Sequence, residues 1–248
     1  MLTQQRRDKI LEILGQNGSI EVTDISKKLG ASESTIRRDI IFLSNLGKLN
    51  KVHGGATQLS HDFSQNEDTF INKSLKNVEE KTKIAKYAAS LINDDDFIFI
   101  DAGSTTWLLT QFIENTGATF VTNGISQAKE LAKKNIKVIL LGGEFKETTE
   151  AITGIEAAVN MQKYNFSKAF IGTNGVTEKQ GFTTPDNAEG IVKSVAVERS
   201  FVSYVLCDST KFGKVSGYSF SKLETSCIIT TKCDDEAIKK KTVVKEID

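Results

Sequence analysis

Residues 97–106 have the sequence FIFIDAGSTT, and this stretch decides the class of the larger part of the chain. Four apolar residues, 97–100, are followed by a turn of small and polar residues, after which a helix is predicted. A short strand that is apolar throughout is typical of a parallel sheet buried on both faces. Further apolar segments alternate with helical patterns as far as residue 230, so we expect an α/β domain with a largely parallel sheet.

The turn after this strand has the composition of an anion-binding site. Its residues Asp101, Gly103, Ser104, Thr105 and Thr106 precede or open the predicted helix. Backbone N–H groups at a helix start, hydroxyl groups and a glycine that lets the backbone approach closely all suit a phosphate. The turn is not a Walker A loop, because the pattern G-x-x-x-x-G-K-[ST] is absent. A simple chain reversal is the alternative for any single turn of this kind.

Further polar turns follow other predicted strands, and the carboxyl ends of parallel strands meet at one crevice. The candidate residues in these turns are Thr122, Asn123, Gly142, Gly143, Gly172, Asp208 and Lys211. We expect a phosphate near residues 104–106 and the rest of the ligand near Asp101, Asp208 and Lys211. Glu189 and Lys193 are also candidates, although residues four apart on a helix more often form a surface ion pair.

Residues 1–57 carry a second pattern, that of a winged helix-turn-helix. Helices are predicted over residues 3–16 and 22–29 and after the N-cap candidate Ser32, and a hairpin with a glycine-rich tip follows. Burial of Ile36, Ile40 and Leu43 would leave the opposite face of the third helix in solvent. The turn, the cap, the buried row and the hairpin occur together, which favours a DNA-binding module.

The residues outside this small core are of the types that bind DNA. The expected DNA contacts are Arg6, Ser34, Thr35, Arg37, Arg38, Lys51 and His53. Arginine can bond guanine through two atoms, hydroxyl groups can bond phosphates, and the hairpin would form a basic wing. The alternative is a solvated face on which Asp39 neutralises the arginines of its own helix. Nine Lys/Arg against six Asp/Glu give this region a net charge of +3, in a chain whose formal net charge is zero.

Three segments of this region, RRDKIL (6–11), GASESTIRRDI (30–40) and KVHGGA (51–56), resemble the DeoR family of bacterial transcriptional regulators. The resemblance continues through DAGSTT (101–106), VTNG (121–124), LLGG (140–143), IGTNG (171–175), GFTTP (181–185) and DSTKFG (208–213). It implies a sensor domain similar in fold to ribose-5-phosphate isomerase and coenzyme A transferases, with a sugar phosphate as ligand. It also implies that Lys73 and Lys81 take part in the effector response. Lys73 stands where arginine is commoner and lacks the planar fork.

The composition is that of an ordinary globular protein. Of the 248 residues 39% are hydrophobic and 26% are charged. The three cysteines, Cys207, Cys227 and Cys233, form no C-x-x-C pattern, so neither a disulfide framework nor a zinc site is expected. No signal peptide is evident, nor is an apolar run of about eighteen residues. We expect a cytoplasmic protein without metal, cofactor or membrane span.

Together these patterns predict a winged helix-turn-helix at residues 1–57, a linker at 58–74 and a sensor domain at 75–248. The leading interpretation is a repressor of a sugar-utilisation operon that binds double-stranded operator DNA and is released by a phosphorylated sugar. Two-fold operators favour a homodimer or a homotetramer. An isomerase or acyl transferase of the same fold is the alternative, with Asp101, Asp208 and Glu189 as candidate bases. The fused DNA-binding module argues against an enzyme.

Overall fold

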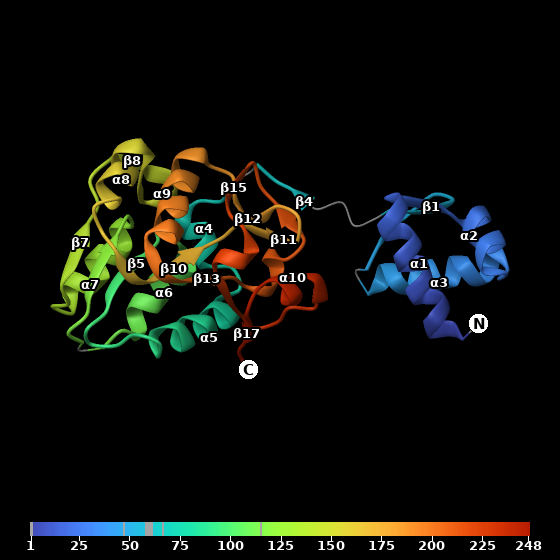
Figure 1. Cartoon of the computed structure of the whole chain (residues 1–248), viewed down its shortest axis with the longest axis horizontal. Coiled ribbons are helices and arrows are strands. Elements are labelled where there is room, and N and C mark those ends of the chain that lie inside the picture. Colours follow the sequence, from blue (N-terminus) through green and yellow to red (C-terminus); the bar gives the residue numbers. More distant parts are fainter. Residues whose placement is uncertain (1, 47, 58–61, 66, 115) are drawn as a thin grey trace. The chain divides into compact units, whose positions relative to one another are not determined.

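The computed structural model describes residues 2–46, 48–57, 62–65, 67–114 and 116–248, in which the chain forms two compact units. The first unit covers residues 1–62 and the second covers residues 63–248 (Figure 1). The second unit therefore begins before the expected boundary at residue 75, because part of the expected linker is folded onto it. Residues 58–61 and residue 66 of that linker lie outside the described residues.

The first unit has the helices and the hairpin of a winged helix-turn-helix. Its elements are α1 (Thr3–Asn17), β1 (Ser19–Glu21), α2 (Val22–Leu29), α3 (Glu33–Asn45), β2 (Asn50–Val52) and β3 (Gly55–Thr57). The strands form an antiparallel sheet in the order β1-β3-β2, so the predicted hairpin gains a third strand that the sequence patterns did not reveal. Gly55 is needed in this sheet, because a Cβ atom there would lie 2.0 Å from the carbonyl oxygen of Ile20.

The core of this unit is the one that the helical spacing predicts. Ile36, Ile40 and Leu43 of α3 are buried against Ile10 and Leu14 of α1. Ser32 is the N-cap of α3, and its hydroxyl accepts a hydrogen bond from the Thr35 N–H at 3.3 Å. The predicted cap and the predicted inner face of α3 are thus confirmed.

The second unit alternates strands and helices. The short strand β4 (Asp62–Phe63) spans the division between the two units. The first half of the second unit then contains α4 (Phe70–Ser74), α5 (Val78–Ala89), β5 (Phe97–Ile100), α6 (Ser104–Phe112), β6 (Thr119–Thr122), α7 (Ile125–Lys133), β7 (Val138–Leu140), β8 (Glu144–Lys146) and β9 (Ala151–Thr153). Its second half contains α8 (Gly154–Met161), β10 (Phe166–Gly172), β11 (Gly175–Thr177), β12 (Gly181–Thr184), α9 (Asn187–Glu198), β13 (Ser200–Leu206), β14 (Lys214–Val215), β15 (Tyr218–Ser221), β16 (Cys227–Thr230), α10 (Glu236–Lys241) and β17 (Val244–Glu246).

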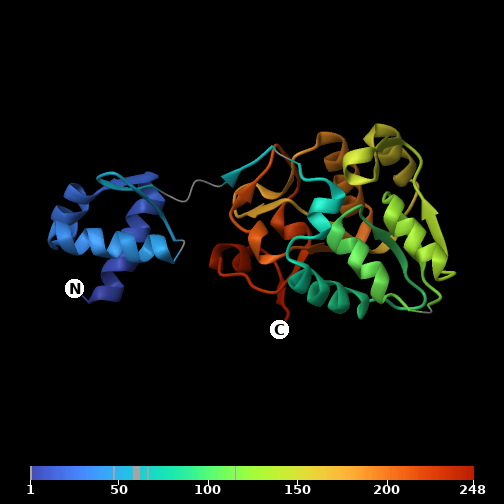
Figure 2. The same ribbon diagram turned by 180° about the vertical axis from the view of Figure 1, so that it is seen from behind.

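Seven of these strands form one parallel sheet, in the order β17-β16-β13-β10-β5-β6-β7. The chain starts at β5, moves outward to β7, and returns to β10 on the other side of β5. Helices α6 and α7 cover one face of the sheet and α8 and α9 cover the other (Figures 1 and 2). Neighbouring strands whose connections leave in opposite directions make a topological switch point, where ligands of open α/β sheets bind.

Alternate residues of each central strand enter two different cores. Phe99, Val121 and Ile171 pack under α8 and α9, whereas Ile100 and Phe170 pack under α5 and α6. Burial on both faces explains why β5 is apolar throughout rather than alternating. The predicted parallel sheet, covered on both faces, is confirmed.

Smaller sheets surround the carboxyl ends of the central strands. β11, β12 and β15 form an antiparallel sheet, β8 pairs with β9, and β4 pairs with β14. Near the last of these, the Ser64 N–H donates to the Val215 carbonyl at 3.0 Å. Ser64, which follows the first unit in the chain, is therefore hydrogen-bonded to the second unit. Within the described ranges, the chain contains no helix with the length and hydropathy needed to cross a membrane.

Candidate functional site

Asp101 and Gly172 meet at the topological switch point, at the ends of β5 and β10. The Asp101 carboxylate, which is 1% exposed, accepts a hydrogen bond from the Gly172 N–H at 2.9 Å. The ammonium of Lys193, from α9, forms a buried ion pair with the same carboxylate and donates to the Gly172 carbonyl at 3.2 Å. Asp101 thus has an internal cationic partner, and its predicted bond to a sugar hydroxyl would have to be made beside that ion pair.

The turn that follows is held rigidly at the start of α6. Gly103 is the N-cap, and its N–H donates to the Thr106 hydroxyl at 2.9 Å. That hydroxyl donates to the Asp101 carbonyl at 2.5 Å, and the Gln127 amide donates to the Gly103 carbonyl at 2.9 Å. Thr106 therefore shapes the turn with its hydroxyl and is fully buried. Ser104 and Thr105, 7% and 8% exposed, begin the helix whose first N–H groups have no partner within it.

Lys81 brings a buried positive charge to this helix start. It lies on α5, is 4% exposed, and its ammonium donates to the Ser104 hydroxyl at 3.0 Å. The Lys73 carbonyl accepts a second hydrogen bond from it. Burial lowers the pKa of Lys81 to about 8, although the nearby Asp208 carboxylate opposes the shift. No carboxylate forms an ion pair with Lys81 among the described residues, so an added anion would stabilise it.

Asp208 is tied to the segment that precedes α5. Asn77, in the left-handed backbone region at φ 51°, donates its amide to Asp208 at 3.0 Å. The Thr210 N–H also donates to this carboxylate, at 3.1 Å. Lys211, in the same turn, is half-buried. Residues expected near the sugar thus lie beside the amino end of α5, which also carries Lys81.

Glu80 fastens the same turn from α5. Its carboxylate accepts from the Ser209 N–H and hydroxyl, each at 2.9 Å, and from the Thr231 hydroxyl at 2.7 Å. Burial would raise the pKa of Glu80, but these hydrogen bonds outweigh it and hold the pKa below its usual range. Glu80 therefore stays ionised and supports the turn.

Lys146 is the centre of a second charged cluster, which the sequence patterns missed. Its ammonium lies 2.5 Å from Glu67, 2.8 Å from Asp186 and 3.2 Å from Glu189. Burial would lower the pKa of Lys146, but the three carboxylates raise it above its usual range. Glu67 also lies 3.3 Å from the Lys73 ammonium. The cluster joins the start of the second unit to β8 and α9.

The surface ion pair between Glu189 and Lys193, considered because the two residues are four positions apart, does not form. Both are buried, at 6% and 4% exposed. Glu189 accepts from the Thr149 hydroxyl at 2.5 Å and pairs with Lys146, whereas Lys193 pairs with Asp101. Spacing on one helix could not show this, because both partners come from distant strands and turns.

Several of the remaining candidates hold the turns together. The Thr122 hydroxyl donates to the Ile100 carbonyl at 2.6 Å, and Asn123 accepts from the Ala102 N–H at 2.9 Å. Gly142 and Gly143 follow β7, and a Cβ on Gly143 would lie 3.0 Å from Ala157 and from Ile152. Their position at the carboxyl end of the sheet is as expected, and each of these contacts is structural. A histidine, cysteine or carboxylate cluster fit to hold a metal is absent from the described residues.

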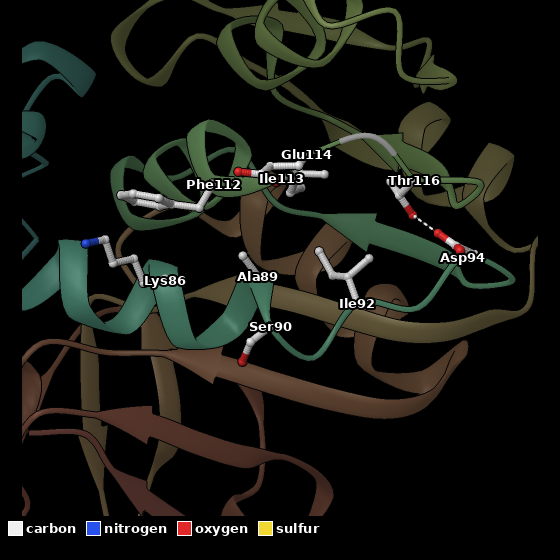
Figure 3. Close-up of a pocket in the computed structure, with 9 residues that line it drawn as sticks. All are labelled: Lys86, Ala89, Ser90, Ile92, Asp94, Phe112, Ile113, Glu114 and Thr116. Carbon is white, nitrogen blue, oxygen red and sulfur yellow. Dashed lines mark hydrogen bonds between the residues drawn. The ribbon is translucent and has the colours of Figure 1, made fainter.

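A shallow pocket of about 350 Å³ lies at the opposite end of the sheet (Figure 3). It is lined by Lys86, Ala89, Ser90, Ile92, Asp94, Phe112, Ile113, Glu114 and Thr116. These residues come from the ends of α5 and α6 and from the turns that lead into β5 and β6. The pocket is therefore separate from the predicted site at the carboxyl ends of the strands.

In the first unit, the predicted recognition residues lie on the exposed side of α3. Arg37 pairs with Glu33 on the same helix at 2.7 Å, and Arg38 donates to the Ser34 carbonyl at 3.3 Å. The Thr35 hydroxyl lies 2.9 Å from the cap hydroxyl of Ser32. Surface pairs of this kind contribute little to stability, so they do not bury or neutralise this face of α3.

Asp39 does not pair with the arginines of its own helix, which the sequence suggested as its partners. It is 2% exposed and binds Arg6 at 2.6 Å and Arg7 at 2.9 Å, both from α1, rather than Arg37 or Arg38. Arg6 thus helps to fix α1 against α3, a structural role in addition to any DNA contact. In the wing, Lys51 and His53 are exposed, as a contact with DNA requires.

Comparison with known proteins agrees with both units. A model of the DeoR C terminal sensor domain matches residues 76–232, and a model of the DeoR-like helix-turn-helix domain matches residues 6–62. The uncharacterized HTH-type transcriptional regulator FruR of Bacillus subtilis (strain 168) is 40% identical over 100% of this chain and 99% of its own. The lactose phosphotransferase system repressor of Staphylococcus aureus (strain NCTC 8325 / PS 47) is 35% identical over 100% of both chains.

Among solved structures, ribose 5-phosphate isomerase A from Methanocaldococcus jannaschii is similar over 55% of each chain, with a TM-score of 0.42 and 18% identity. The full-length relatives are described as regulators and repressors, and the alternative of an enzyme finds no support among them. The two family models cover the helix-turn-helix unit and most of the sensor unit in the order in which the chain carries them. This chain therefore belongs to the DeoR family of DNA-binding transcriptional regulators.

Proposed function

We propose that this regulator represses genes of sugar utilisation and leaves its operator when a phosphorylated sugar binds the second unit. The lactose phosphotransferase system repressors that span the whole chain support the sugar-related role. Two copies on a two-fold operator are the simplest assembly, and a tetramer would place two such pairs together.

The observation that carries the proposal is the buried ammonium of Lys81 at the start of α6. A buried cation without an ion pair is unfavourable, and helix N-termini attract anions through their free N–H groups. Lys81, Ser104 and Thr105 therefore suit the phosphate. A dianionic phosphate would meet a charge, a hydroxyl pair and helix N–H groups at one point.

Binding of this phosphate would act on the segment that leads to the first unit. The Lys81 ammonium holds the Lys73 carbonyl at the end of α4, and Lys73 itself pairs with Glu67. A phosphate that draws the Lys81 ammonium toward itself would weaken its hold on α4. The change would then pass through Glu67 toward residues 63–65, which directly follow the DNA-binding unit in the chain.

Operator release with a panel of sugar phosphates tests the proposal. The full-length chain is bound to labelled operator DNA and titrated with aldose and ketose phosphates and with the corresponding free sugars. At least one phosphate should release the chain at a concentration far below that of its free sugar. Lys81→Met should keep operator binding and lose release, whereas Lys83→Met, an exposed lysine two positions away, should behave as wild type. Equal potency of the free sugar, or normal release of Lys81→Met, would contradict the proposal.

A further inference from the structure

An isoleucine stands in the row of α3 that faces away from the core. Ile36, Ile40 and Leu43 form the buried row of α3. Each residue turns the helix by about 100°, so a second row with the same spacing lies on the opposite side of the helix and begins at residue 34. This outer row consists of the exposed residues Ser34, Arg38, Ile41 and Asn45. Ile41 keeps 41% of its surface exposed and is not among the side chains that pack against the core of the first unit. Among the described residues of the unit, packing in the hydrophobic core therefore does not account for this apolar side chain.

The neighbouring exposed aromatic residue differs in this respect. The Arg7 guanidinium lies over the Phe42 ring, 3.5 Å from its centre, and donates to Asp39 at 2.9 Å. Phe42 is therefore part of the α1–α3 contact, and its exposure is explained. No such aromatic or ionic neighbour accounts for Ile41 in the described residues.

Building on the operator binding proposed above, we propose that Ile41 reads sequence by packing against the C5-methyl group of a thymine in the major groove. That methyl group is the apolar feature by which the major groove distinguishes thymine from the other bases. Arg37 and Arg38 stand beside Ile41 with exposed side chains, so the face that carries it suits a polyanion. A β-branched side chain on a helix keeps one χ1 rotamer, so its γ-methyl group has a fixed position.

The spacing along α3 fits this role. Ile41 lies three residues after Arg38, which is about 4.5 Å farther along the helix axis. Successive bases of one strand are about 3.4 Å apart, so Ile41 would reach a base within one or two steps of the position met by Arg38. The side chain then adds discrimination of thymine to the hydrogen bonds made by the residues at the start of the helix.

Replacement of single thymines by 2′-deoxyuridine tests the proposal, because it removes only the methyl group. An operator is first selected from random duplexes with the full-length chain, and each thymine is then replaced in turn at fixed salt. One thymine in each half-site should lose about fourfold in affinity, the effect of one buried methyl group. Ile41→Ala should bind the thymine and uracil duplexes equally, and Ile41→Thr, which keeps one γ-methyl group, should keep part of the preference.

Leu46→Ala is the matched control. Leu46 is also an exposed apolar residue of the same helix end, 55% exposed, but lies outside the outer row, so its variant should keep the full preference. An operator without any methyl-sensitive thymine would overturn the proposal, and so would a preference that persists in Ile41→Ala. A change in oligomeric state of Ile41→Ala with an unaltered thymine preference would also overturn it and would assign the side chain to a contact between copies.

Discussion

Lys81→Met should stabilise the second unit at neutral pH while it removes the response to effector. The pKa of Lys81 is lowered from 10.5 to about 8 by burial. At about 1.4 kcal/mol per unit, the buried ammonium destabilises the fold by about 3 kcal/mol at pH 7. The two hydrogen bonds to Ser104 and Lys73 offset about 1 kcal/mol each, and the variant loses them. The net gain for Lys81→Met is therefore about 1 kcal/mol.

The pH dependence of this gain gives the sharper test. Below pH 8 Lys81 is protonated in both the folded and the unfolded chain, so the full destabilisation is present. Between pH 8 and 10.5 the folded chain releases the proton while the unfolded chain keeps it, and the stability of the wild type rises relative to the variant. From pH 7.5 to 9.5 the advantage of Lys81→Met should fall by about 2 kcal/mol.

Urea unfolding followed by tryptophan fluorescence measures this difference. The chain has one tryptophan, Trp107, which lies on α6 and packs edge-on against Phe70 with ring centres 6.1 Å apart, so it reports on the second unit. Lys83→Met, at an exposed position of the same helix, is the control and should show no comparable pH trend. If Lys81→Met loses several kcal/mol at pH 7 and the loss does not change with pH, Lys81 is a structural cation and the anion site is refuted.

Further predictions concern the charge of both sites. Thr105→Glu should abolish operator release by sugar phosphates, because its carboxylate would occupy the start of α6, where we place the phosphate. Its DNA affinity in the absence of effector should not change, and normal release would contradict this placement. Arg38→Ala should weaken operator binding by about 1–3 kcal/mol at fixed salt, while ligand binding, followed by thermal shift, stays as in wild type. Asp39→Ala should destabilise the first unit by about 3 kcal/mol in chemical unfolding, because Arg6 and Arg7 lose a buried partner; a loss below 0.5 kcal/mol would show that water replaces it. Effector affinity should fall as the pH rises above about 8, because burial lowers the pKa of the Lys81 ammonium to about 8 and the neutral amine attracts the phosphate less; a titration at constant salt measures this.

The sequence by itself determined the local features of both units. The spacing of Ile36, Ile40 and Leu43 set the inner face of α3, and Ser32 set where the helix begins. The apolar run of β5 and the small residues after it gave a strand, a turn and a helix start. These predictions held because each depends on residues within one or two turns of one another, where periodicity and capping act directly.

Only the tertiary structure decided which of these residues meet. The strand order places β10 beside β5, and this brings Lys193 to Asp101 across 92 positions of the chain. The ion-pair partners that the sequence suggested for Glu189 and Asp39 were also wrong. Spacing along one helix gives no information about charges on other elements. No sequence motif points to Lys146, and its role comes from three carboxylates, Glu67 near the start of the second unit and Asp186 and Glu189 at the start of α9. Buried charges take their partners from whichever elements pack beside them, so the layering of the sheet, rather than the local pattern, fixes the site.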